Sequence, residues 1–284
     1  MKLYLSTFFS FYCLLSQAQF LDLTSDWFTE ESFFIEQTIQ EHKIKSIVIS
    51  KSNKLDGRYF SSEKDALKYT FNPSGQLMQS LKFISFSSRT DSSSFHFFYN
   101  KNKDVFKRVE KEGPFSFTYY FVYQDKKLKK EIKIDNNSPH LDTAYIRFYK
   151  HQLVGDNSSK IIYYNSIQRP YQYREDKFDL FGQLVHQKTS LARSLNFTEK
   201  KFTYQVNQLT EKRSFTSIGK QQTHLWKYSY KSGILDFIKH YENEVLIEKL
   251  GFTYLKNGIV SAIVTRDLKR KSVTIYKLDY NFFD

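Results

Sequence analysis

A short motif that recurs along the chain constrains its fold more than any other feature. The motif consists of an aromatic residue, a polar turn that often contains glycine, and an aliphatic residue. The leading aromatic residues follow one another at spacings of 24 to 29 residues, which indicates one structural unit repeated about eight times. Four copies have seven residues (71–77, 99–105, 178–184 and 254–260), and four are one residue shorter (123–128, 149–154, 204–209 and 230–235).

Each copy of the motif predicts a β-hairpin. In the first copy, Asn72 and Pro73 suit the first two positions of a type I turn. Gly75 suits the fourth position, where the backbone takes a positive φ. The aromatic residue before the turn and the aliphatic residue after it then face each other across the hairpin. Replacing Gly75 or Gly182 by Val is therefore expected to lower the melting temperature by several degrees.

The repeat predicts an all-β fold, an antiparallel β-hairpin repeat array over residues 44–284. A unit of about 26 residues holds two strands of roughly 8 to 10 residues, so eight units predict about 16 strands. An open twisted sheet rarely exceeds about 10 strands, which favours a curved or wrapped sheet. Aromatic residues alternate with other residues along 115–123 and 274–282, as expected for strands with one buried face. A sandwich, a wrapped sheet and a barrel all remain open from the sequence.

Residues 1–18 have the pattern of a cleavable signal peptide. Residues 1–2 provide a positive start, residues 3–15 form an apolar run, and residues 16–18 match a small-x-small cleavage site. We therefore expect a mature chain that begins at Gln19 and is exported to the periplasm, the cell surface or the medium. No later apolar run approaches the roughly 20 residues that a bilayer requires, so no transmembrane helix is expected in the mature chain.

Residues 19–43 are expected to form an N-terminal cap segment with a short helix over residues 29–41. Thr29 is a favourable N-cap residue, and Glu30 and Glu31 suit the positive end of a helix. From residue 44 onward the helical pattern gives way to strand-like alternation. The expected organisation is therefore a signal peptide, this segment and one hairpin-repeat domain.

The motif at this spacing resembles the YD repeats of RHS-type bacterial secreted proteins, and less closely the MORN-variant repeats of bacterial envelope proteins. The resemblance covers roughly residues 44–284 and implies an envelope or secreted hairpin-repeat protein. The Tyr-Asp pair that gives the YD repeat its name is mostly lost, because only Phe178-Asp179 keeps the Asp. The resemblance implies a fold more than it implies an activity.

The sequence carries no recognisable pattern of a catalytic or metal centre. Its seven histidines are scattered without zinc-site spacing, and the chain lacks a Gly-x-Ser-x-Gly elbow and a phosphate-binding loop. The single cysteine, Cys13, falls within the predicted signal peptide. We therefore expect a non-enzymatic protein without a cofactor or a metal.

The basic character of the chain is its most useful indication of function. The chain has 43 Lys and Arg against 30 Asp and Glu, a formal net charge of +13. Such an excess favours an anionic envelope polysaccharide, lipid head groups or another envelope protein as partner. Export makes nucleic acid an unexpected partner. Two clusters are candidate anion-binding sites: Lys126, Lys127, Lys129 and Lys130, and Arg266, Lys269, Arg270 and Lys271.

Other interpretations of these features remain open. Lysines also protect strand edges from pairing with other chains, and solvated strand faces with edge protection are the favoured explanation of the two clusters. An outer-membrane β-barrel shares the signal peptide and the strand alternation, although charges such as Lys249 interrupt the strands. A carbohydrate-binding or carbohydrate-active envelope protein is the third alternative, with Trp27, Trp226 or exposed tyrosines as stacking platforms.

Overall fold

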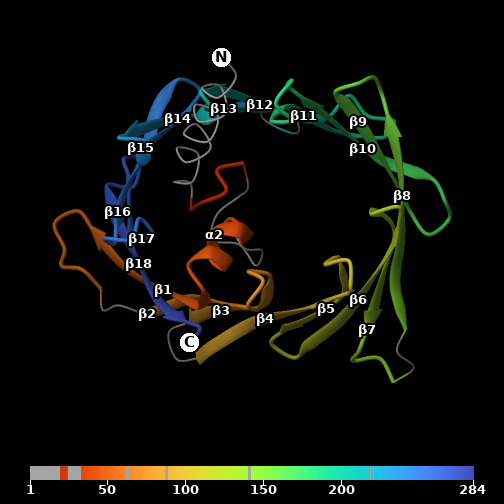
Figure 1. The fold of residues 1–284 in the computed structure, drawn as a ribbon, viewed down its shortest axis with the longest axis horizontal. Helices are drawn as coiled ribbons and strands as arrows, with labels where there is room; N and C mark the ends of the chain where they lie inside the picture. The colour runs from red at the N-terminus through yellow and green to blue at the C-terminus, as the bar shows by residue number, and fades with distance from the viewer. Residues whose placement is uncertain are drawn as a thin grey trace, which may run out of the picture.

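The described chain folds into a closed ring of eighteen antiparallel strands. The computed structural model describes residues 20–24, 33–61, 64–86, 89–139, 142–217, 219 and 221–284, so the predicted signal peptide lies outside the described residues. Each strand pairs with the next along the chain, and β18 pairs with β1 to close the ring (Figure 1). The strands are β1 (Ile44–Leu55), β2 (Lys64–Phe71), β3 (Leu77–Phe86), β4 (Arg89–Tyr99), β5 (Val105–Glu112), β6 (Phe115–Gln124), β7 (Lys127–Asp135), β8 (Thr143–Leu153), β9 (Ser158–Tyr164), β10 (Pro170–Phe178), β11 (Leu184–Leu191), β12 (Phe197–Gln205), β13 (Gln208–Thr216), β14 (Gln222–Lys231), β15 (Ile234–Glu242), β16 (Val245–Tyr254), β17 (Val260–Asp267) and β18 (Ser272–Phe282).

The repeated motif forms the predicted hairpins. In the first copy, Gly75 N–H donates to the Asn72 carbonyl at 2.9 Å, and Gly75 has φ +84°. Three of the four shorter copies turn through two residues with positive φ, such as Asp125 (+51°) and Lys126 (+58°), which matches the twist of the flanking strands. The aromatic and aliphatic residues of seven copies lie opposite each other, as predicted: Phe71 and Leu77, Tyr99 and Val105, Tyr123 and Leu128, Phe178 and Leu184, Tyr204 and Leu209, Tyr230 and Leu235, and Tyr254 and Val260.

The copy at 149–154 has a different register from the predicted one. Strand β8 continues to Leu153, and Tyr149 lies opposite Tyr163 instead of Val154. His151 occupies the position that tyrosines hold in other units, since its Nε2 lies 2.8 Å from the Leu128 carbonyl. A pattern that accepts only Phe or Tyr at the first position therefore places this turn too early, at 151–152 instead of 154–157.

Neighbouring units are joined by the hydroxyl groups of the motif tyrosines. Tyr230 Oη donates to the Leu209 carbonyl of the preceding unit at 2.8 Å. Burial raises the pKa of such tyrosines, and that of Tyr99 reaches about 12. The motif thus supplies an interlocking contact between units as well as a turn. The same contact joins Tyr99 to Leu77, Tyr204 to Leu184, Tyr254 to Leu235 and Tyr280 to Val260.

A one-residue register shift beside each of these seven aromatic–aliphatic pairs explains why the sheet curves into a ring. Each shift is a β-bulge, for example between Thr70 and Phe71, and bulges increase the local twist and bend of a strand. Repetition at regular intervals bends the whole sheet in one direction, so the wrapped sheet predicted from the sequence closes. The ring has eighteen strands instead of about sixteen because β1 and β18 lie outside the eight motif copies and pair with each other.

The described part of the N-terminal segment lies inside the ring (Figure 1). Its helix, α2 (Glu36–Glu41), is shorter than predicted, and Ile35 precedes it in an extended conformation. Thr29, the predicted cap, lies outside the described residues. Phe34 is part of a bridge to Leu21 where the sequence predicts helix, because both side chains pack into the core.

The hydrophobic core forms between this segment and part of the inner wall. Phe33 is fully buried, and its ring lies 6.0 Å from that of Tyr69 on β2. Phe20 contacts Tyr280 of β18 at 6.1 Å, so the segment bridges the seam where the ring closes. On the far side, Tyr228 Oη of β14 donates to the Leu23 carbonyl at 3.4 Å. Strands β1–β4 and β12–β18 thus share one core with the segment.

Candidate anion-binding surface

The strand register separates the charges of the barrel into two walls. Residues that share a face with Ile47 and Tyr69 point into the ring, and alternate residues point outward. Inward-facing Lys and Arg are matched in number by carboxylates: Lys51, Lys82, Arg108, Lys133, Arg147, Arg174, Lys200 and Lys212 against Glu110, Glu112, Glu131, Asp135, Asp176, Glu242, Glu248 and Asp267.

The outer wall carries most of the excess positive charge. Among side chains that the structure describes, outward-facing strand carboxylates are Glu175, Glu199, Glu211 and Asp279. A basic outer wall around a balanced inner wall therefore explains the net charge of +13. The outward-facing cations are Lys54, Lys68, Lys107, Lys111, Lys127, Lys130, Lys150, Lys160, Lys177, Lys188, Lys201, Arg213, Lys227, Lys231, Lys239, Lys249, Arg266 and Lys277.

Four of these cations form a continuous row across β14–β17, which we call the cation row. Lys227 lies opposite Lys239, Lys239 opposite Lys249, and Lys249 opposite Arg266. Lys227 is 3.9 Å from Glu211 on β13, whereas the other three form no ion pair within the described part of the chain. Like charges directly opposite each other destabilise a sheet, so the row is not explained by stability of the fold.

Aromatic residues and a glycine flank the cation row. Lys239 Nζ lies 5.4 Å from the Phe237 ring centroid, and Lys227 Nζ lies 6.0 Å from that of Tyr241. Between Phe237 and Val264, the outer wall has Gly251, and a Cβ added to Gly251 would meet no atom within 4 Å. The row is thus bordered by half-buried rings and by an open position.

The predicted C-terminal cluster lies where the cation row ends. Arg266 and Lys271 line a cleft of about 360 Å³ between β1, β17 and β18, together with Lys54, Asp56 and Asp267. Lys269 forms an ion pair with Glu242, and Arg270 with Asp267 at 3.8 Å. Two of the four predicted residues therefore face the cleft, and the other two are paired with carboxylates.

The predicted cluster at residues 126–130 lies at the opposite end of the barrel. Lys126 is in the exposed turn between β6 and β7, and Lys127 begins β7. Lys129 lies in the bulge, and Lys130 points outward with its Nζ 5.7 Å from the Phe148 ring centroid. The β6–β7 turn and the β17–β18 turn join strands at opposite ends, so one ligand contacting both would have to span the barrel.

A carboxylate network lines the inner wall away from the N-terminal segment. Glu131 is buried, accepts hydrogen bonds from Tyr145 (2.5 Å) and Tyr149, and lies 3.9 Å from Arg147. Burial and the hydrogen bond to Glu131 raise the pKa values of both tyrosines. A buried carboxylate needs hydrogen-bond or ionic partners, and Glu131 has three in Tyr145, Tyr149 and Arg147. The network is therefore explained by the stabilisation of this buried charge.

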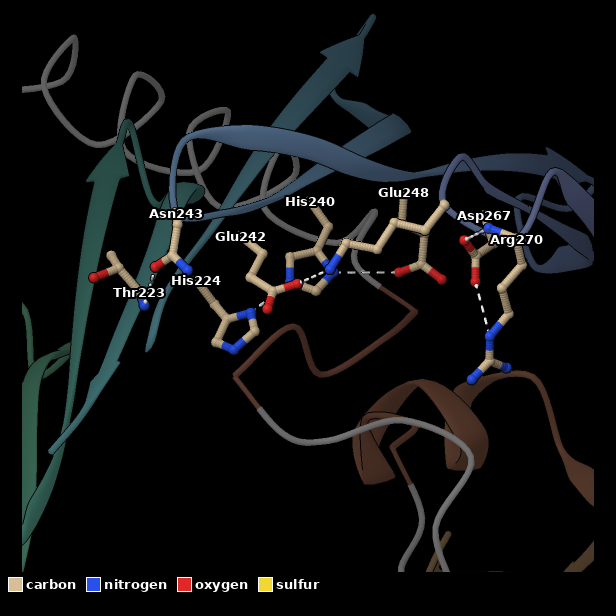
Figure 2. Close-up of polar contacts among 9 residues, drawn as sticks. Thr223, His224, His240, Glu242, Asn243, Glu248, Asp267 and Arg270 are labelled. Atoms are coloured by element: carbon tan, nitrogen blue, oxygen red, sulfur yellow. Dashed lines mark hydrogen bonds and ion pairs between the residues drawn. The ribbon is translucent and has the colours of Figure 1, made fainter. Parts of the chain in front are cut away.

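A histidine pair faces inward at the start of β14 and the end of β15 (Figure 2). His224 Nδ1 lies 3.1 Å from His240 Nε2, and His240 Nδ1 lies 3.4 Å from Glu248. Burial, and then the neighbouring His240, lower the pKa of His224. Trp226 is one of the predicted sugar-stacking residues. Its ring stacks on His240 with the ring centroids 4.5 Å apart, so one face of the Trp226 ring is covered. Trp27, the other predicted platform, lies outside the described residues.

Two further features bear on the predicted absence of a metal and of a membrane helix. Within the described part of the chain, no group of three or more His, Cys, Asp or Glu is placed to hold a metal ion. None of the helices in the same part is both long and apolar enough to cross a bilayer.

Comparisons with known proteins give fold similarities at low sequence identity. No family model and no curated protein matches the chain. A porin-like protein from Bacteroides uniformis has 10% identity and a TM-score of 0.42, over 83% of this chain and 98% of that one. A porin-like protein from Bacteroides vulgatus has 12% identity and a TM-score of 0.30, over 84% and 99%. The Photorhabdus luminescens Tc holotoxin pore has 11% identity and a TM-score of 0.22, over 69% and 15%.

These TM-scores are all below 0.5, so the similarities do not indicate a function. The class of protein follows from the chain itself: an all-antiparallel, closed hairpin-repeat barrel with an internal N-terminal segment. The outer wall of the barrel is basic. The composition of the chain indicates the excess of positive charge but not its position on the outer wall. The cation row escapes a sequence search because its members are far apart in sequence, and only the strand register aligns them.

Proposed function

We propose that this protein is an exported, non-enzymatic binding module of the bacterial envelope, whose basic outer wall holds an anionic partner. The unequal distribution of charge carries this proposal: the inner wall is balanced, whereas the outer wall has many more cations than carboxylates. A charge excess concentrated on one wall attracts polyanions over several ångströms and raises their association rate. Export rests on the pattern of residues 1–18.

The charges of the outer wall favour contact with water over contact with lipid. Lys239 and Lys249 lie in the middle of their strands, and each faces outward. A Lys that faces lipid at mid-depth costs about 2–4 kcal/mol, and such residues recur around the wall. This argument supports a barrel surrounded by water.

A membrane-inserted barrel is the second candidate, favoured by one region of the outer wall. Tyr120, Ile132 and Ile146 lie opposite one another on β6, β7 and β8, and form an apolar row. The closed ring also satisfies the backbone hydrogen bonds of every strand, as a bilayer requires. Fractionation separates the two candidates, since a membrane barrel needs detergent for extraction and shifts in a gel on boiling.

Salt-dependent retention tests the proposed function. The full-length mature protein is applied to immobilised alginate, to dextran sulfate and to neutral dextran at about 50 mM salt, and eluted with a gradient. We expect retention on the two anionic polymers, release as salt screens the charges, and passage through neutral dextran. Failure to bind either anionic polymer would contradict a role in polyanion binding.

A further inference from the structure

We infer that the cation row on β14–β17 is a binding track for an acidic polysaccharide, which lies across the strands with one anionic group at each cation. This inference rests on the proposed function and gives it a location and a ligand class. Lys239, Lys249 and Arg266 are the central residues, and Lys227 extends the row on one side.

The electrostatics of the row favour a linear polyanion. Three adjacent cations directly opposite one another repel each other, and the described chain supplies no carboxylate partner to Lys239, Lys249 or Arg266. An anionic chain bound along the row removes this repulsion, so each bound group gains from more than one cation. Some cations elsewhere on the wall do have a carboxylate partner, as Lys160 has in Glu175 at 2.8 Å and Lys201 in Glu199 at 3.5 Å.

The spacing of the row suits a polymer with one charge per sugar. Neighbouring strands are about 4.7–4.9 Å apart, so four residues in line span roughly 14 Å. The spacing between neighbouring strands, and so between neighbouring cations, is comparable to the length of one sugar residue in an extended polysaccharide. The row leads to the cleft of about 360 Å³, which is lined by Lys54, Arg266 and Lys271 and by the carboxylates of Asp56 and Asp267. The three cations outnumber the two carboxylates, so the cleft offers a site for the next anionic group.

The borders of the row favour a polysaccharide over a lipid surface or a thin phosphate chain. Phe237 and Tyr241 are half-buried beside the cations, and aromatic rings stack on the C–H faces of sugars. Gly251 leaves an open position next to Lys249, on the same strand and the same wall. A sugar ring can occupy this space, whereas a compact phosphate group would leave it empty.

Three variants test the track, and a fourth controls for charge. The row variant is K239Q/K249Q/R266Q, and the control K101Q/K103Q/R193Q removes as many charges from the exposed β4–β5 and β11–β12 turns. Gly251→Val keeps every charge and fills the open position; Gly251→Ala is its smaller counterpart. The Gly251 φ is not positive and its surroundings are open, so both substitutions are compatible with the strand. Thermal melting verifies that each variant folds.

Binding is measured on alginate, on inorganic polyphosphate and on vesicles of anionic phospholipid. We expect the row variant to bind alginate at least about tenfold more weakly, and the turn control to change by no more than about twofold. Gly251→Val should weaken binding to alginate but leave binding to polyphosphate unchanged, with Gly251→Ala between Gly251→Val and wild type.

The remaining outcomes separate the inference from the proposed function. Equal losses in the row variant and the turn control would overturn the track, because total charge would then explain binding. Unchanged alginate binding by Gly251→Val would overturn the polysaccharide geometry. Tighter, row-independent binding to vesicles would replace the polysaccharide with a lipid surface. Wild-type protein that binds none of the three probes would overturn the proposed function itself.

Discussion

At the scale of single residues, Gly75 and Gly182 occupy the same turn position in different surroundings. Both have positive φ, +84° and +78°. A Cβ on Gly75 would lie 2.2 Å from the Glu36 carbonyl oxygen of α2, whereas a Cβ on Gly182 would meet no atom within 4 Å. The first glycine therefore serves both the turn and the close approach of the internal helix, and the second serves the turn alone.

Substitution by Ala should distinguish these two roles. A left-handed conformation costs an L-residue roughly 1–2 kcal/mol, so Gly182→Ala should lower the melting temperature by a few degrees. Gly75→Ala adds a backbone clash and should lower it by clearly more. Thermal melts of the two variants, followed by circular dichroism, provide the measurement. Equal shifts would mean that α2 does not approach this turn.

The histidine environments predict how stability depends on pH. Burial lowers the pKa of His224, with His240 adding to the effect, and burial and then Lys111 lower that of His96. An unfolded histidine has a pKa of about 6.5. As pH falls through this value, the unfolded chain takes up protons that the folded chain resists, so stability is lost and the loss levels off below the lowered pKa values.

We therefore expect the melting temperature to fall between about pH 7.5 and pH 5.5. The double variant H96Q/H224Q should have a smaller fall over the same interval, because neither Gln titrates. Measurements above pH 5.5 exclude the carboxylates, whose protonation occurs at lower pH. A melting temperature that is constant or rises on acidification of the wild type would refute this assignment.

At the scale of elements, the N-terminal segment depends on the barrel for its structure. Helix α2 has six residues and no side-chain cap, and isolated helices of that length are unstable in water. Its position is set by the burial of Phe33 and Phe34 against Tyr69 and Phe71. This explains why the sequence predicts a helix here but not where α2 begins: the packing of Phe33 and Phe34 keeps the chain extended up to Ile35.

Removal of one aromatic ring from this segment should destabilise the whole barrel. Phe33 is fully buried, so Phe33→Ala should cost about 3–5 kcal/mol through lost burial and a cavity. Leu180→Ala is the matched control, since Leu180 is 91% exposed and its loss should have an effect near zero. Urea unfolding at equilibrium measures both. Comparable stabilities for Phe33→Ala and wild type would show that the segment does not contribute to the core.

At the scale of the whole molecule, closure of the ring depends on the pairing of β1 with β18. The two strands pair along the full length of β1, and Phe283 N–H donates to the Lys43 carbonyl at 2.8 Å. Closure leaves no strand edge free, which protects a long sheet from pairing with other chains. A chain lacking residues 272–284 would expose the edges of β1 and β17 and lose the buried Leu278.

We expect this truncated chain to aggregate, as judged by size-exclusion chromatography and sedimentation. A chain that lacks only Asp284 keeps every strand and should elute as wild type does. If the longer truncation were monomeric and cooperatively folded, the ring would not need its seam for stability.

The sequence alone determined the strand content, the hairpins and the residues that pair across them, because turn chemistry and alternation act within a few residues. It did not determine the register at Tyr149, where His151 substitutes for a Phe or Tyr. The closure of the ring and the alignment of Lys239, Lys249 and Arg266 were decided only by the tertiary structure. The physical reason is that both depend on register accumulated over many strands, which no local segment of the chain encodes.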